Sequence, residues 1–141
     1  MLSDADFRLL QLVPRCSYAY RMRGAAFEAL GQLNSALKDY QTAAELSPSN
    51  SFSHYYLGEI YSELGVHDKA VESYKTAIGL GDESWGTRLH LGFALQKAER
   101  FAKAIVRFQE VREQVLANDG FEFVVDICDR AISECRARNR P

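Results

Sequence analysis

Residues 51–84 read SFSHYYLGEIYSELGVHDKAVESYKTAIGLGDES, and the pattern of this stretch occurs three times in the chain. Gly24, Gly58 and Gly92 are 34 residues apart, and the same spacing separates Ala36, Ala70 and Ala104, and also Tyr40, Tyr74 and Phe108. A period of this length, made of helix, turn and helix, is typical of stacked helical-repeat arrays. The sequence therefore predicts an all-α protein built from antiparallel helix pairs.

Each half of residues 51–84 has the periodicity of an amphipathic helix. We expect Gly65 to end the first helix, because glycine adopts the left-handed conformation that caps a C-terminus. Gly58 inside that helix costs about 1 kcal/mol relative to alanine. We therefore expect it to permit close packing of the two helices at Gly58 and Ala70, with Tyr74 beside them. The apolar positions are Tyr56, Leu57, Ile60, Tyr61 and Leu64, then Ala70, Val71, Tyr74, Ala77, Ile78 and Leu80.

This unit resembles the tetratricopeptide repeat (TPR), and the resemblance covers about residues 17–118. It implies an all-α, right-handed superhelical array of antiparallel helix pairs, a tetratricopeptide-like solenoid. The first copy departs from the family pattern at Arg23, where leucine is usual, and the second at Asp82, where proline is usual. The third departs at Ala98 and Glu99, among other positions. The second copy matches at His54, Leu57, Gly58, Tyr61, Leu64, Gly65, Ala70, Tyr74 and Ala77.

Residues 1–141 are expected to form a single helical-repeat domain. Repeat 1 is residues 17–50, with helices over 17–31 and 34–46; repeat 2 is 51–84, with helices over 51–65 and 67–80; repeat 3 is 85–118, with helices over 85–98 and 101–116. Residues 1–14 are expected to form a helix that is either a native N-terminal cap or part of a preceding repeat in a longer array. Residues 119–137 are expected to form a C-terminal capping helix. Its predicted apolar face carries Phe121, Val124, Val125, Cys128, Ile132 and Cys135.

Composition favours an ordinary globular protein. The 141 residues are 47% hydrophobic and carry a net charge of -2, which argues against nucleic acid as the main partner. The sequence has no apolar run of the roughly 18 residues that span a membrane, and residues 1–13 lack the pattern of a signal peptide. Cys16, Cys128 and Cys135 are expected to be reduced thiols, which favours a cytoplasmic location.

The sequence contains no recognisable catalytic motif. It has no glycine-rich phosphate loop with its lysine and no nucleophile elbow. The three histidines are not at ligand spacing from cysteines or carboxylates. We therefore expect no enzymatic activity, no cofactor and no metal site.

Function is then expected to reside on a surface. The resemblance implies that the first helix of each pair lines a concave groove, and the groove-facing residues of this chain are rich in aromatic side chains, which are common at binding hot spots. The expected partner is a peptide or helix of another protein, apolar and with some positive charge, because Glu28, Glu59 and Glu63 lie beside the aromatic residues. The expected groove residues are Tyr18, Arg21, Met22, Phe52, Tyr55, Tyr56, Glu59, Glu63, Leu89, His90, Phe93 and Lys97, with Ala25 and Glu28 in the first repeat.

Some members of the family grip the C-terminal carboxylates of heat-shock chaperones with three cations and two asparagines. Here only Arg21 matches, because Ala25, Tyr56, Gly86 and His90 occupy the other four places. A doubly charged terminus would lack its charge-assisted hydrogen bonds, so we expect no chaperone carboxylate clamp. The alternative hypothesis is a self-assembly or docking segment of a larger enzyme or complex.

Overall fold

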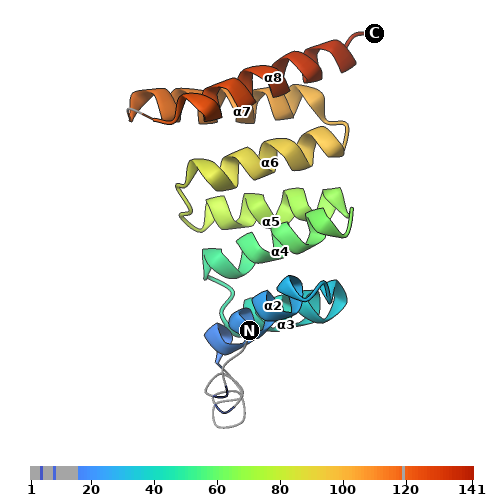
Figure 1. Cartoon of the computed structure of the whole chain (residues 1–141), viewed down its shortest axis with the longest axis vertical. Helices are drawn as coiled ribbons and strands as arrows, with labels where there is room; N and C mark the ends of the chain where they lie inside the picture. The colour runs from blue at the N-terminus through green and yellow to red at the C-terminus, as the bar shows by residue number, and fades with distance from the viewer. Residues whose placement is uncertain (1–3, 5–7, 9–15, 119) are drawn as a thin grey trace. The chain divides into compact units, whose positions relative to one another are not determined.

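In the computed structural model, residues 4, 8, 16–118 and 120–141 are described. Within these residues the chain is helical and contains no strand, which confirms the all-α helical-repeat fold (Figure 1). The expected helix over residues 1–14 lies outside the described residues, apart from residues 4 and 8. The described helices are α2 (Ser17–Ala29), α3 (Leu33–Leu46), α4 (Ser51–Glu63), α5 (His67–Gly79), α6 (Trp85–Lys97), α7 (Phe101–Ala117) and α8 (Glu122–Arg138).

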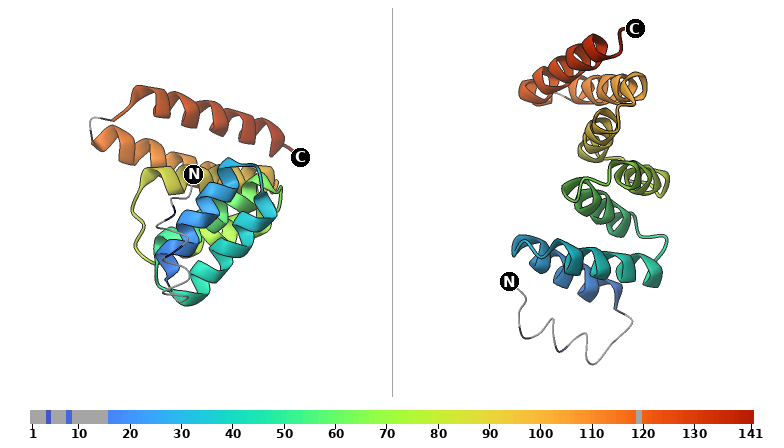
Figure 2. Two further views of the ribbon diagram at one scale, coloured as in Figure 1. Left: turned by 60° about the horizontal axis from the view of Figure 1, so that its bottom comes forward. Right: turned by 90° about the vertical axis from the view of Figure 1, so that its right-hand side faces the viewer.

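The chain forms two compact units, Met1–Gly81 and Asp82–Pro141. In the first, α2 packs against α3 and α4 against α5; in the second, α6 packs against α7 and α7 against α8 (Figures 1 and 2). The six repeat helices agree with the predicted ranges to within about two residues, which is the usual uncertainty of helix ends. The assignment of residues 1–141 to a single domain stays a prediction.

The three periodic glycines allow an aromatic ring of the following helix to lie against the backbone. A Cβ atom added to Gly58 would be 2.5 Å from Tyr74 Cε1, and one added to Gly92 would be 2.6 Å from Phe108 Cε1. Gly24 has the same relation to Tyr40, at 2.8 Å. Each ring is buried. Helix packing therefore explains why glycine occupies a helix interior, as the sequence predicted.

The turns inside the helix pairs also repeat. Gly31 and Gly65 have φ angles of 73° and 74°, so both adopt the left-handed conformation that was expected for Gly65. Glu99 lies 34 residues after Gly65 and has a φ of 59° in the same turn. A side chain in this conformation costs about 1–2 kcal/mol, because its Cβ approaches the following carbonyl oxygen. The third repeat thus retains the turn of the first two repeats without glycine, the residue that adopts it most easily.

Arg23, the residue in place of the usual leucine, has an acidic partner that the sequence analysis did not identify. Its Nε donates to Asp39 Oδ2 at 2.7 Å and its Nη2 to Oδ1 at 2.8 Å. The Asp39 side chain is only 4% exposed and that of Arg23 28%. This hydrogen bond is the main cause of a raised pKa of Arg23. The first repeat therefore replaces an apolar contact with a two-pronged ion pair.

Asp82, in place of the usual proline, organises the start of α6. Its carboxylate accepts hydrogen bonds from the Ser84 backbone N–H and from the Thr87 hydroxyl, while the Ser84 side chain caps the helix by accepting from Thr87 N. Burial alone would raise the pKa of Asp82, but these hydrogen bonds outweigh it and lower the pKa below its ordinary value of 3.8. Hydrogen bonds of Asp82 and Ser84 thus fix the start of α6.

The C-terminal helix α8 packs on α7 through Val124, Cys128, Ala131, Ile132 and Cys135, all of them buried. Phe121 was predicted to share this apolar face, and that prediction is wrong: its side chain is 58% exposed. The physical reason is that Phe121 precedes the first helical turn with an extended backbone, at φ -70° and ψ 107°, so helical periodicity does not direct its side chain.

Candidate functional site

The expected groove residues of repeats 1 and 2 lie on the first helix of each pair, α2 and α4, and together form what we call the α2–α4 face. Tyr18, Met22 and Phe52 are its exposed apolar members, with 55%, 39% and 62% of their surface accessible. Large apolar side chains at this exposure are available for contact with a partner. The face also includes Arg21, Glu28, Tyr55, Tyr56, Glu59 and Glu63.

Arg21 links the two helices of this face. Its guanidinium carbon lies 5.6 Å from the centre of the Tyr18 ring and 5.7 Å from that of Phe52. These are cation–π distances, and each such contact contributes about 0.5–1 kcal/mol at an exposed site. The Nε atom of Arg21 is buried and has no hydrogen-bond partner. Arg21 is therefore held against aromatic rings.

Four tyrosines, two of them on α4, form a connected cluster. Tyr56 stacks on Tyr40 of α3, with ring centres 5.2 Å apart and planes inclined by 12°. Tyr55 meets Tyr56 edge-on at 5.4 Å and lies 6.1 Å from Tyr74 of α5. Both Tyr55 and Tyr56 are half-buried. Packing with other tyrosines holds these two rings in place, so they form the half-buried part of the face.

Two acidic residues of the face accept hydrogen bonds from the hydroxyl groups of buried tyrosines. Tyr40 Oη donates to Glu28 Oε2 at 2.6 Å, and Tyr74 Oη donates to Glu59. Burial raises the pKa of Glu28; the Tyr40 hydrogen bond opposes this shift, and the neighbouring Glu63 and Glu59 carboxylates add to it. Burial and these hydrogen bonds likewise raise the pKa of both tyrosines. Glu28, Glu59 and Glu63 therefore form a group of neighbouring carboxylates, and a bound cation would reduce their mutual repulsion.

The two hydroxyl contacts were missed at the sequence level, where Tyr40 and Tyr74 were given packing roles only. The sequence contained one sign of these hydroxyl contacts: the aromatic position is tyrosine in the first two copies but phenylalanine, Phe108, in the third. The acceptors do not follow the repeat period, since Glu28 and Glu59 are 31 residues apart (59 minus 28). Periodicity therefore gave no way to pair them.

The expected groove residues of repeat 3 lie on α6, in the second unit. Leu89 is buried, with 8% of its surface exposed. Phe93 packs edge-on against Phe108 at 5.1 Å between ring centres, His90 is half-buried and Lys97 is exposed. Continuity between these residues and the α2–α4 face stays a prediction.

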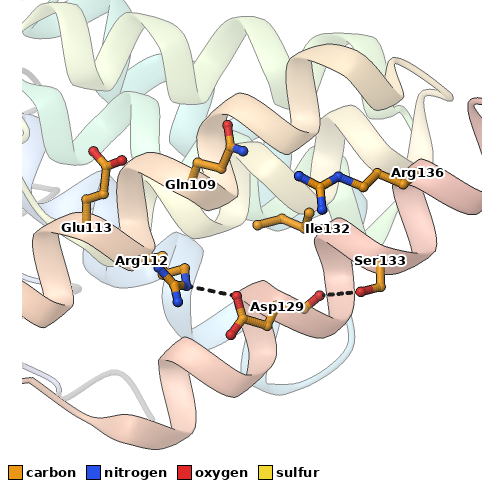
Figure 3. Close-up of a pocket in the computed structure, with 7 residues that line it drawn as sticks. All are labelled: Gln109, Arg112, Glu113, Asp129, Ile132, Ser133 and Arg136. Atoms are coloured by element: carbon orange, nitrogen blue, oxygen red, sulfur yellow. Dashed lines mark hydrogen bonds and ion pairs between the residues drawn. The ribbon is translucent and has the colours of Figure 1, made fainter.

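A polar cavity of about 470 Å³ lies between α7 and α8 in the second unit (Figure 3). Arg112 Nε donates to Asp129 Oδ1 at 2.8 Å, and the Ser133 hydroxyl donates to the Asp129 backbone carbonyl. Arg136 extends over Ile132 toward Gln109 (Figure 3). Asp129 and Glu113 balance the two arginines, so the cavity has no excess of either charge. None of its residues was among the sequence-predicted sites.

Within the described part of the chain, no group of three or more histidine, cysteine, aspartate or glutamate residues is arranged to hold a metal ion. The three cysteines are free thiols. Among the helices described, none combines the length and the apolar composition that crossing a membrane requires.

Comparison with known proteins gives matches to two family models, described as "TPR repeat" over residues 24–65 and "Tetratricopeptide repeat" over residues 53–80. No curated protein matches the chain.

Solved structures with the same fold include the TPR2B domain of yeast Sti1 in its pHsp70 complex, with a TM-score of 0.77 and 14% identity over 87% of this chain and 98% of that one. The Arabidopsis OM64 TPR domain has a TM-score of 0.72 and 19% identity over 84% of this chain and 94% of that one. The first TPR of Spaghetti (RPAP3), bound to the HSP90 peptide SRMEEVD, has a TM-score of 0.74 and 19% identity over 86% and 93%. At these identities the similarity establishes the fold. The two family-model matches show that residues 24–80 of the chain are tetratricopeptide repeats.

Proposed function

We propose that the chain is a non-catalytic protein-interaction scaffold whose α2–α4 face binds a peptide or helix of a partner protein. TPR-family proteins are generally interaction modules, and the fold supports this class of function. The observation that carries the proposal is the exposed aromatic surface of Tyr18 and Phe52 near the start of α2 and α4, with the carboxylates of Glu28, Glu59 and Glu63 further along the same two helices. We further propose that the protein is cytoplasmic, in keeping with its free thiols. We also propose that its partner is a protein and not a nucleic acid.

The partner segment carries apolar side chains and a lysine or arginine. Tyr18, Met22 and Phe52 offer apolar area near the start of α2 and α4, and tyrosine, phenylalanine and methionine adapt to different partner side chains. Glu28 and Glu63 lie in the last turn of their helices, where the helix dipole adds further negative potential. A basic side chain placed there gains charge-assisted hydrogen bonds.

An acidic chaperone terminus is a poor ligand for this face. Arg21, the residue that matches a clamp cation, already packs between Tyr18 and Phe52. The carboxylates of Glu28, Glu59 and Glu63 would repel an acidic peptide. We therefore propose that this chain differs in ligand from the relatives whose structures contain chaperone peptides.

Selection of a random peptide library on the purified chain tests the proposal. We expect the selected peptides to combine apolar residues with lysine or arginine, and the peptide SRMEEVD to bind at least about tenfold more weakly than they do. Phe52→Ser should abolish binding while leaving the helical circular dichroism unchanged, because the Phe52 side chain is 62% exposed.

Glu63→Gln, which removes one exposed charge, should weaken binding of the basic peptides specifically. Val106→Ser, in the other unit, is the control for loss of an exposed apolar side chain, since Val106 is 45% exposed, and it should leave their binding unchanged. Selection of acidic peptides only, or survival of all peptide binding in Phe52→Ser, would contradict the proposal.

A further inference from the structure

Three aromatic side chains meet on the second unit, at the start of α6 and the connection between α7 and α8. The ring centres of Trp85 and Phe121 are 6.2 Å apart, and those of Phe121 and Phe123 are 5.6 Å apart. Trp85 is half-buried, whereas Phe121 and Phe123 have 58% and 59% of their surface exposed. We call these three residues the Trp85–Phe123 patch.

The packing of α8 does not account for this patch. The buried face of α8 is complete without it, since Val124, Cys128 and Ile132 fill the contact with α7. Full burial of a phenylalanine is worth about 1.5–3 kcal/mol, and two phenylalanines here forgo much of that gain. Aromatic side chains that touch one another while staying exposed are typical of binding surfaces.

Negative charge surrounds the patch. Glu83 lies two residues before Trp85, Glu122 lies between the two phenylalanines, and Asp126 lies one helical turn after Phe123; all three are exposed. Arg88, the cation nearest to Trp85 in sequence, donates to the Glu83 backbone carbonyl at 2.6 Å and to Gln114 Oε1 at 3.3 Å. A ligand with flanking positive charges therefore complements the patch.

We propose that the Trp85–Phe123 patch is a second docking surface, which takes an amphipathic helical segment of a partner with lysine or arginine flanking its apolar residues. The patch goes beyond the proposed function, because all of its residues lie in the second unit and none belongs to the α2–α4 face. A fully buried aromatic residue covers about 150–250 Å², so three partly exposed ones offer on the order of 300 Å². A stable interface between two copies needs about 800 Å² per partner. The area therefore favours a short segment over a second copy of the chain.

Trp85 is the single tryptophan of the sequence, so its fluorescence reports directly on the patch. The probes are three tryptophan-free synthetic peptides. The first is helix-forming, with leucine at positions i, i+3, i+4 and i+7 and lysine at both ends. The second has glutamate in place of lysine, and the third has serine in place of leucine. Each is titrated into the full chain at low ionic strength, where charge effects are largest.

We expect the lysine-flanked leucine peptide to shift the Trp85 emission to shorter wavelength in a saturable manner. The glutamate-flanked and serine peptides should bind at least about tenfold more weakly. Phe121→Ser/Phe123→Ser should lose the response without loss of helix content, because both side chains are exposed. Glu83→Lys/Glu122→Lys should reverse the preference between the lysine and glutamate peptides.

The α2–α4 face is tested separately by Phe52→Ser, which should leave the Trp85 response intact even if it abolishes other binding. The proposal is overturned if no peptide shifts the emission, if lysine and glutamate peptides bind equally, or if the double phenylalanine variant still responds. It is also overturned if the emission shifts with protein concentration alone and sedimentation shows a dimer that Phe121→Ser/Phe123→Ser abolishes, because a second copy then covers the patch.

Discussion

The ion pair of Arg23 and Asp39 predicts a strong coupling between the two positions in the free energy of unfolding. In the second repeat the corresponding residues, 34 positions later, are Leu57 and Ser73. The variants are therefore Arg23→Leu, Asp39→Ser and the double substitution, each of which transfers the second repeat's residues to the first.

Arg23→Leu should be the most harmful of the three. It leaves the Asp39 carboxylate, whose side chain is 4% exposed, without its two charged hydrogen bonds. Removing one partner of a buried pair costs about 3–5 kcal/mol. Partial access of water at this site and the apolar contact of leucine offset part of that cost, so we expect a loss of about 3 kcal/mol. For a chain of this length this lowers the midpoint temperature by on the order of 10 °C.

Asp39→Ser should cost about 1 kcal/mol, because the freed guanidinium of Arg23 is partly exposed and can be hydrated. The double variant should lie within about 1 kcal/mol of the wild type, since replacing a buried ion pair on both sides is often neutral. The coupling energy is then about 4 kcal/mol, the sum of the two single losses. Urea unfolding monitored by circular dichroism, at unchanged m-value, measures all four free energies. A neutral Arg23→Leu, or a double variant no more stable than Arg23→Leu, would refute this reasoning.

Three further predictions concern stability. Glu99→Gly should raise the free energy of unfolding by about 1 kcal/mol by relieving the left-handed turn, whereas Gly65→Ala should lower it by a similar amount; thermal unfolding of both variants checks the sign, and equal signs would contradict the explanation. Gly58→Ala should destabilise by up to about 2 kcal/mol, because overpacking against Tyr74 costs about 1–3 kcal/mol and the helix-propensity gain offsets only about 1 kcal/mol of it; stabilisation would show that the Tyr74 ring moves aside. The wild type should have a larger free energy of unfolding than Asp82→Asn, by an amount that is constant above pH 3.8, the ordinary pKa of Asp82, and that disappears as the pH falls through the lowered pKa of Asp82 in the folded state. A difference that grows on acidification would contradict the assigned hydrogen bonds.

The repeat period was sufficient to predict the helices because each copy repeats the same packing constraints. Gly58 against Tyr74 and Gly92 against Phe108 are the same contact made twice. What the period did not predict are contacts made by residues that deviate from it. Arg23 was recognised as a deviation, but its partner Asp39 lies on the next helix and was not identified.

The candidate site shows the same limit. The exposed positions of Tyr18 and Phe52 follow from helical geometry, since the face of a helix that meets solvent is set by its periodicity. The position of Phe121 does not, because it precedes the helix and its backbone is extended. The patch with Trp85 depends on a contact between residues 36 positions apart (121 minus 85), which neither helical nor repeat periodicity specifies.

Tyr40 connects three helices: it belongs to α3, donates to Glu28 of α2 and stacks on Tyr56 of α4. Separation of α2 from α3, or of α3 from α4, therefore breaks contacts of the same side chain. In hydrogen-exchange terms, the amides at the centres of α3 and α4 should open together in a single cooperative step. The first two repeats then behave as one folding unit, and cutting the chain between Pro48 and Ser51 should unfold both.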